Sequence, residues 1–372
     1  MKRRKPLPAV LLIAFVVLLP ATAVRAQEDS ARVQGSTGTT MLTEPDSTGW
    51  SVYLDNDILT PRPRDRDYTG GISFTLTGHR AATWPVSADS LLGIIDNTAG
   101  LPVENHEAGI YQTHSLQLGV AAFTPGDILV TSVIPGDRPY AALIYLANSR
   151  LSLDEKNPDS AQLSTLTLGV LGSTLVPGAQ RIFHRAIGSD TPEAWSHQVS
   201  HGGEPTLRYS YVRQHLLASG ENQYARYEIK PSFEAGAGFI TDASVALSAR
   251  WGTITTPWWS FSPDRTEYFS QPATGLAPGQ VRSGRELYAF VGGKLKVRPY
   301  NVFLQGQFRH SDLTYGPDDI RPVMAEAWLG VTGQLSDDYW LSWELRYQTS
   351  ELRVEPGDRP LVWGRIFITR YF

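Results

Sequence analysis

The sequence predicts an all-β fold, a transmembrane antiparallel β-barrel of about 12 strands with a short helix in an extracellular loop. Two observations carry this prediction. After Trp50 the chain runs through segments in which apolar and polar side chains alternate, separated by clusters of Gly, Pro, Asp and Asn. In addition, no uninterrupted apolar stretch of about 18 residues follows the N-terminal segment. A soluble β-sandwich gives the same alternation, so the pattern alone does not separate the two folds.

The N-terminus predicts export. Residues 2–5 are Lys-Arg-Arg-Lys, residues 6–23 are largely apolar, and small residues follow at Ala21-Thr22-Ala23 and Val24-Arg25-Ala26. This order is typical of a secretory signal peptide, here residues 1–26, and an N-terminal membrane anchor is the alternative. We expect a flexible polar segment over residues 27–48, a barrel domain over residues 49–372, and a location in the outer membrane of a Gram-negative-type cell.

Charge and cysteine content exclude several classes of function. Residues 1–26 contain five of the 33 basic residues and none of the 37 acidic ones, so 28 against 37 leaves a net charge of −9. An acidic exported chain is a poor binder of nucleic acid, which requires positive charge at the phosphates. The chain has no cysteine, which excludes disulfides, a cysteine nucleophile and thiolate zinc sites.

Thirteen segments have the alternation expected of strands. They are residues 51–57, 71–77, 114–122, 140–153, 162–172, 206–216, 224–236, 244–251, 286–297, 302–310, 324–335, 339–347 and 361–372. Single-chain bacterial barrels close with an even number of strands, so we expect twelve. The segment 339–347 illustrates the two faces: Trp340, Ser342, Glu344 and Arg346 share one parity and predict a polar lumen, while the other parity is apolar and predicts a lipid-facing wall.

One segment departs from the β pattern. In residues 177–187 the apolar side chains recur at helical spacing, and Gly188 is placed to end a helix. Gln180 and His184 lie one turn apart on a shared face of that helix.

Two polar clusters are candidates for chemistry. Asp55 and Asp57 share a face of a strand, and the Thr69-Gly70-Gly71 turn brings backbone carbonyls close, an arrangement that suits a hard cation such as calcium. A solvated acidic loop tip is the alternative. The second cluster is His184 with Asp190, where an imidazole could accept a proton from water or simply make a structural hydrogen bond.

A third cluster, over residues 124–127 and 135–140, fits a turn capped by an Asp–Arg pair. If the mature N-terminus is periplasmic, the loops after the first, third and fifth strands all face outward. The three clusters would then meet at the extracellular rim, beside the outer leaflet.

These motifs resemble the lipid A 3'-O-deacylase (LpxR-like) family of outer-membrane proteins. The resemblance rests on Asn56-Asp57, the run 67–71, the Pro-Gly-Asp-Arg-Pro-Tyr of 135–140, and Gln180 to Gly188 followed by Trp195, in the family's order and spacing. It covers roughly residues 50–200, and the later strands agree only in architecture. The family is a twelve-stranded barrel with calcium-dependent esterase activity on lipid A.

The resemblance implies roles for particular residues. His184 would be the general base that activates water, and Asp57 a ligand of Ca²⁺. Asn56 and Thr69 would shape the metal and oxyanion site, with Thr69 counted among the metal ligands. Gln180 and Asp190 match polar positions beside the base, and Asp190 is a further candidate ligand. The implied partner is lipid A of lipopolysaccharide in the outer leaflet, and a monomer is the simplest expectation.

The sequence departs from the family at two places. The family has a lysine in its third loop, whereas residues 127–130 are Asp-Ile-Leu-Val; Arg62, Arg64 or Arg66 could substitute as phosphate contacts. The stretch 80–112 falls on the periplasmic side, where turns are usually short, so either it is an insertion or one strand is miscounted.

Two other functions fit a barrel of this kind. A phospholipase-type serine esterase needs Ser and His on one face, but the candidates His310 and Ser311 are adjacent and point to opposite faces. A porin or structural barrel would have an open lumen and would be indifferent to changes at His184.

Overall fold

The computed structural model describes residues 44–60, 67–178, 192, 194–265, 276, 281 and 283–372. The predicted signal peptide, most of the segment 27–48, Gln180, His184 and Asp190 lie outside these residues, as do Arg62, Arg64 and Arg66. Within the described part of the chain, no helix is long and apolar enough to cross a membrane.

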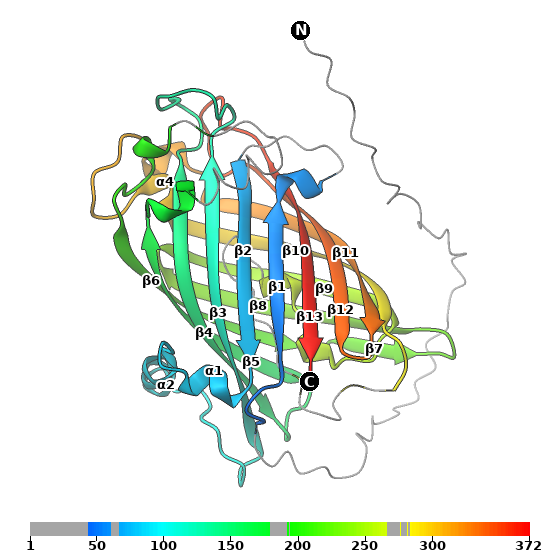
Figure 1. The fold of residues 1–372 in the computed structure, drawn as a ribbon. Helices are drawn as coiled ribbons and strands as arrows, with labels where there is room; N and C mark the ends of the chain where they lie inside the picture. Colours follow the sequence, from blue (N-terminus) through cyan, green and yellow to red (C-terminus); the bar gives the residue numbers. More distant parts are fainter. Residues whose placement is uncertain are drawn as a thin grey trace. The chain divides into compact units, whose positions relative to one another are not determined.

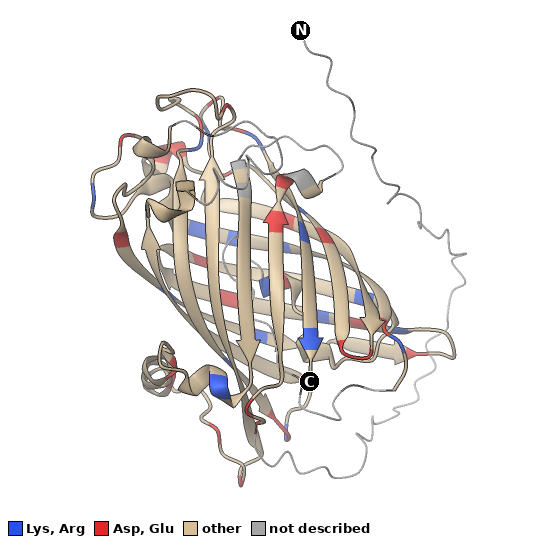
Figure 2. Ribbon diagram, in the orientation of Figure 1, with Lys and Arg blue, Asp and Glu red and all other residues tan. Residues whose placement is uncertain are grey.

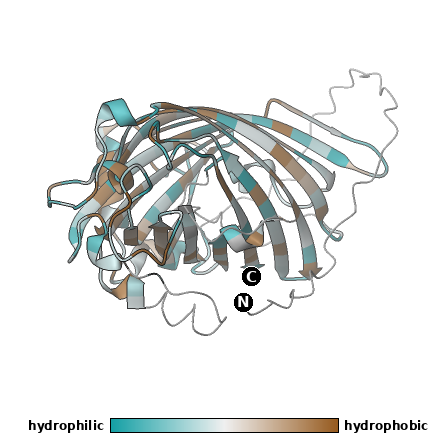
Figure 3. Cartoon of the chain, turned by 90° about the horizontal axis from the view of Figure 1, so that it is seen from above, coloured by the Kyte–Doolittle hydropathy of each residue, from teal (hydrophilic) through white to brown (hydrophobic). Residues whose placement is uncertain are grey.

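The described residues form thirteen strands in one antiparallel sheet (Figure 1). The strands are β1 Gly49–Asn56, β2 Asp67–Thr77, β3 Ile110–Thr124, β4 Ala141–Asp154, β5 Ser160–Leu171, β6 Glu204–His215, β7 Ala218–Glu221, β8 Arg226–Gly238, β9 Ile240–Thr253, β10 Leu287–Asn301, β11 Val323–Ser336, β12 Tyr339–Gln348 and β13 Leu361–Tyr371. β1 pairs with β13, and β6 pairs with β8, so the sheet closes on itself and the strands curve around a common interior (Figure 3). β7 pairs only with β8, which leaves twelve strands in the ring and confirms the predicted barrel.

Short helices connect the strands. They are η1 Asp57–Leu59, α1 His79–Thr83, α2 Asp89–Thr98, η2 Trp195–His197, η3 Trp258–Ser260, η4 Pro263–Arg265, α4 Val302–Gln305 and η5 Pro317–Asp319. Residues 175–178 are also helical, so the helix expected from Pro177 begins earlier, with that proline in its first turn, where its missing N–H costs nothing.

The two ends of the barrel differ. We call the end with the loops after β1, β3, β5, β10 and β12 the loop end, and the end with Gly49, Tyr371, α1 and α2 the terminal end (Figure 1).

Two expectations about the strands need correction. The predicted strand over residues 302–310 is wrong: β10 runs on to Asn301, whose side chain accepts from the Phe303 N–H at 3.1 Å and begins α4. Val302, Phe303 and Leu304 are then all fully buried, which consecutive residues of a strand with one lipid-facing side are not. The stretch 80–112 is an insertion that contains α1 and α2, and not a miscounted strand.

Side chains alternate between the lumen and the outer wall along each strand. In β12 the parity of Trp340, Ser342, Glu344 and Arg346 is buried, which confirms the polar inner face. On the outside, one row of paired residues runs from β3 to β6. This leucine row consists of Leu118, Leu146, Leu168 and Leu207.

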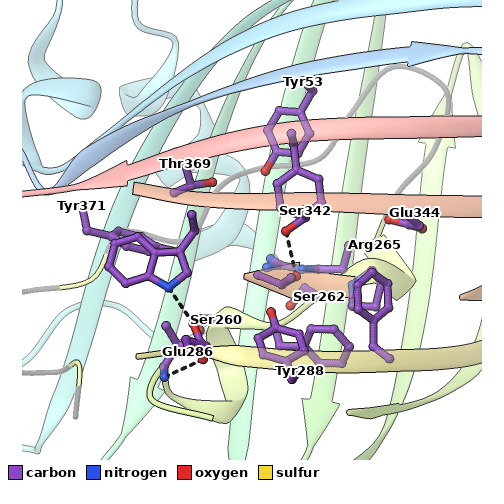
Figure 4. Close-up of a pocket in the computed structure, with 17 residues that line it drawn as sticks. Tyr53, Ser260, Ser262, Arg265, Glu286, Tyr288, Ser342, Glu344, Thr369 and Tyr371 are labelled. Atoms are coloured by element: carbon purple, nitrogen blue, oxygen red, sulfur yellow. Dashed lines mark hydrogen bonds between the residues drawn. The ribbon is translucent and has the colours of Figure 1, made fainter. Parts of the chain in front are cut away.

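Lys, Arg, Asp and Glu residues occur along the barrel strands (Figure 2), and inside the barrel many of their side chains pair with one another and contact a folded-in segment. Arg250 pairs with Glu228 at 2.7 Å. Residues 255–265, which we call the lumen segment, enter from the terminal end after β9: the Phe261 carbonyl accepts from Lys230, and the Pro263 carbonyl accepts from Arg346. Beside this segment lies a cavity of about 60 Å³ (Figure 4).

The ion pair at the loop-end half of β1 gives a stability prediction. Arg365 donates to both carboxylate oxygens of Asp55, and both residues are buried. Arg365→Met should lower the free energy of unfolding by about 3–5 kcal/mol, because it leaves a buried carboxylate without its cation. Urea unfolding followed by heat-modifiable gel mobility measures this. The double variant Asp55→Asn/Arg365→Met should recover part of the lost free energy of unfolding. An equal loss in the single and double variants would show that the unpaired Asp55 carboxylate is not what destabilises the barrel.

Candidate functional site

The first predicted cluster divides at the end of β1. Asp55 points into the lumen, where Tyr68 donates to its Oδ2 at 3.1 Å beside the Arg365 ion pair. Its carboxylate is therefore used to hold β1, β2 and β13 together. The expectation that Asp55 and Asp57 form one carboxylate pair at the strand end does not hold, because the strand stops at Asn56 and Asp57 begins η1.

Asn56 faces the opposite way. It shares the parity of Leu54, which is 40% exposed on the outer wall. A Cβ placed on Gly70 would lie 3.1 Å from Asn56 Nδ2 and 2.8 Å from the Asp55 carbonyl oxygen, so the amide lies directly against a glycine that leaves room for it. Gly70 has φ of +149°, in a region that residues with a side chain rarely adopt.

Asp57 is next to this amide and is only 3% exposed, although it lies at the rim of the barrel. Thr60 closes the turn by donating its hydroxyl to the Asp57 carbonyl at 2.7 Å. On the other side, Gly364 pairs with Asn56 and lies against Leu59 of η1. The short turn thus holds a buried carboxylate beside an outward-facing amide.

The neighbouring strand β2 has a bulge at the predicted residue Thr69. Tyr68 pairs with Phe123 and Gly70 pairs with Ala122, so Thr69 is the extra residue between two consecutive partners. A bulge re-aims the local backbone and is common at barrel rims and beside active sites. The pairing of β1 with β2 thus brings the backbones of Asn56 and Thr69 close together, and Asp57 follows at the end of β1.

The segment expected to carry the base is anchored on the outside of the wall. Val176, before residues 179–191, and Trp195, after them, both pack in one cluster with Ala122 and Tyr140. The rings of Tyr140 and Trp195 lie 4.9 Å apart. Ala122 of β3 pairs with Gly70 of β2. Val176 and Trp195 therefore pack on the outer wall, and only β2 separates the strand beneath them from β1, which carries Asn56. Gln180, His184 and Asp190 belong to the stretch between these flanks, outside the described residues.

The third predicted cluster has a structural role. Asp137 accepts from Gly126 N at 2.8 Å and from Arg359 Nη2 at 2.6 Å, and this second arginine replaces the expected local partner Arg138. Arg138 instead lies 3.5 Å from Glu351. Burial alone would raise the pKa of Glu351, but the charges of Arg298 and Arg138 outweigh it and hold that pKa below its usual value.

The donor set is compatible with a hard cation only in part. Asp57 and Asn56, which are consecutive in the chain, supply a carboxylate and an amide oxygen, and calcium prefers both ligand types. The described residues contain no group of three or more His, Asp or Glu side chains that could hold a metal. Further ligands would have to come from residues such as Asp190.

Sequence reasoning missed two features of this site. One is the outward orientation of Asn56, which its shared parity with Leu54 could have revealed. The other is the pairing of Asp55 with Arg365, which are 310 positions apart, so no local pattern indicates it.

Comparison with known proteins supports the barrel fold and identifies a family. The structure of LpxR from Salmonella typhimurium superposes with a TM-score of 0.66 at 18% identity, covering 87% of this chain and 100% of that one. The β domain of the Bordetella autotransporter BrkA, at a TM-score of 0.39 and 11% identity, covers 88% of this chain and 99% of its own. No curated protein matches the sequence. The sequence model of the family described as "Outer membrane protein LpxR" matches residues 10–372, and the chain therefore belongs to the LpxR family of outer membrane proteins.

Proposed function

We propose that this protein is a calcium-dependent esterase that removes an acyl chain from lipid A in the outer leaflet, using water activated by His184. The observation that carries the proposal is the placement of Asn56 on the outer face of the wall, beside the bulge at Thr69. Val176 and Trp195, which flank residues 179–191, pack on the same face nearby. A site on that face is open to the lipid phase, where an acylated substrate lies. This narrows the expected location from the extracellular rim to the outer surface of the wall near the loop end, which would face the cell exterior.

The proposed reaction is hydrolysis of one ester. His184 takes a proton from water, the oxygen attacks the ester carbonyl carbon, and the carbon–oxygen bond to the sugar or acyl hydroxyl breaks as the proton returns to that oxygen. The products are a fatty acid and a lipid with one free hydroxyl. Asn56 would donate to the carbonyl oxygen as charge develops there, and Gln180 would help to orient the imidazole. Asp57, Thr69 and Asp190 would hold calcium, which when bound supplies a positive charge near that oxygen.

The filled lumen argues against a porin. The lumen segment and the ion pairs around Lys230 and Arg346 occupy the interior at mid-barrel height. A channel would need this segment to leave, which would leave the buried Lys230 of β8 without its partner Asp264.

The serine-esterase alternative is favoured by one observation. At the loop end, His197 Nδ1 lies 2.5 Å from Asp312 Oδ2, as in a hydrolase triad. The nearby hydroxyls are engaged elsewhere: Ser200 donates to Glu204 at 2.5 Å, and Ser311 accepts from Ser200 N at 3.0 Å. Labelling by a fluorophosphonate probe that His197→Ala abolishes would support that alternative over water activation.

The first prediction concerns the base. In a Gram-negative host, wild type should convert lipid A to a species lighter by one acyl chain, and His184→Ala should reduce this conversion by about 10²–10⁴-fold, since it removes the general base. Mass spectra of extracted lipid A measure the ratio. His310→Ala, an exposed histidine at the same end, is the matched control and should retain activity. No acyl loss with folded wild type would sink the deacylase assignment.

The second prediction concerns calcium. Chelation with EGTA should abolish hydrolysis by purified protein in detergent micelles, and added Ca²⁺ should restore it. Asp57→Asn should raise the Ca²⁺ concentration for half-maximal activity by at least about tenfold, because it removes a ligand charge. Asp318→Asn, an exposed loop carboxylate, should leave the Ca²⁺ requirement unchanged. Full activity in EGTA would rule out the metal.

The third prediction concerns the space at Gly70. Gly70→Ala should lower activity by about 10–100-fold, because its Cβ would displace the Asn56 amide and the adjoining backbone. Gly293→Ala, on β10, is the control, since its Cβ would meet its nearest atom at 3.4 Å. Equal activities of the two folded variants would show that the position of Asn56 does not matter.

A further inference from the structure

The insertion that contains α1 and α2 packs on the outside of the barrel wall. Asp89, at the start of α2, accepts from Arg150 of β4, with Nε to Oδ1 at 2.8 Å. Asp96, near its end, accepts from Ser164 of β5 at 2.6 Å and from Tyr209 of β6 at 2.9 Å. Helix α2 therefore runs across three strands, along the circumference of the barrel.

The height of α2 is fixed relative to the leucine row. Asn148, Leu166 and Tyr209 form the next outward row toward the terminal end, one step below Leu146, Leu168 and Leu207. Asn148 accepts from the Ala88 N–H at 2.8 Å, just before α2 begins. An α-helix is about 10 Å wide with its side chains, so α2 lies directly against the lower edge of the leucine row.

The side of α2 away from the wall carries no charge. Its exposed residues are Ser90, Leu91, Ile94, Asn97 and Thr98. Leu91 is 46% exposed and Ile94 is 64% exposed, and Trp84, between α1 and α2, is 45% exposed. Both acidic side chains that face the wall, Asp89 and Asp96, are buried.

The apolar wall has two different heights. On β10 the outward residues from Leu287 to Val297 are exposed or partly exposed, about 33 Å along the strand and about 25 Å along the membrane normal at a typical tilt. On β3 only Leu118 and Val120 lie between Leu116, which is buried where α1 packs, and Ala122, which is buried beneath Trp195. This leaves roughly 10 Å of uncovered wall, well short of the apolar band of an outer-membrane barrel.

We propose that the α1–α2 insertion is a membrane-interface element, whose exposed face lies among the phospholipid headgroups and upper acyl chains of the leaflet at the terminal end. Leu91, Ile94 and Trp84 continue the lipid-facing leucine row toward the terminal end and complete the band that β3 leaves short. A tryptophan at this height fits the aromatic girdle of membrane proteins. An amphipathic helix in the plane of the interface buries its apolar face about 5–10 Å deep, which matches a helix docked at the edge of the wall.

The chain has no cysteine, so single cysteines carry a spin label at chosen sites. The variants are Leu91→Cys and Ile94→Cys on α2, Val291→Cys on the exposed wall of β10, and Glu107→Cys on an exposed loop as the aqueous reference. Purified full-length protein is placed in phosphatidylethanolamine–phosphatidylglycerol vesicles. Electron paramagnetic resonance then gives the collision rates of each label with oxygen, which concentrates in lipid, and with a water-soluble nickel chelate.

We expect the oxygen-to-nickel ratio at positions 91 and 94 to approach that at 291 and to exceed that at 107 several-fold. Nickel access equal to that at 107 would place this face in water and overturn the proposal. Labels shielded from both oxygen and nickel would show that protein covers the face, a second copy in this purified sample, and would overturn it as well. Heat-modifiable mobility of each variant verifies that the barrel is folded.

Discussion

The ion pair between Asp55 and Arg365 decides which way the end of β1 faces. It holds one carboxylate in the lumen, and strand alternation then turns the next side chain, Asn56, to the outer wall. Everything proposed for catalysis follows from that orientation. A site on the outer face meets a lipid without first extracting it from the membrane, whereas a site in the lumen would have to draw an acyl chain through a wall of hydrogen-bonded strands.

The same division of faces explains the rest of the architecture. The lumen contains ion pairs and the lumen segment, whose contacts tie the strands to one another. The outer wall has distinct regions on β3–β6: the 179–191 flanks near the loop end, the leucine row in the middle, and α2 near the terminal end. The proposed catalytic site, the leucine row and the proposed interface element would thus follow one another along one side of the barrel.

Alternation with period two sufficed to predict most strands, because each strand dictates it locally, and the resemblance of the motifs to the LpxR-like family favoured a barrel over a sandwich. It failed where a local interaction overrode the pattern: Asn301 caps α4, and three apolar residues then bury together where a strand was expected. Motif order pointed to Asn56, Asp57 and Thr69 as parts of one site, and the pairing of β1 with β2 brings their backbones close together. Sequence reasoning assigned Asp55 to a metal-like pair because its true partner, Arg365, is brought beside it only when β13 closes the ring. The local partner expected for Asp137 failed for the same reason, since Arg359 belongs to a distant loop.

The central claim is that residue 184 meets Asn56 on the outer face of the wall, and cross-linking in this cysteine-free chain tests it most directly. Cysteines placed together at 56 and 184 should form a disulfide rapidly under mild oxidation in native membranes. Cysteines at 318 and 184 should not, because residue 318 lies in the exposed loop that contains η5. Efficient linkage of 184 to 318 with none to 56 would put the histidine elsewhere and contradict the proposed site.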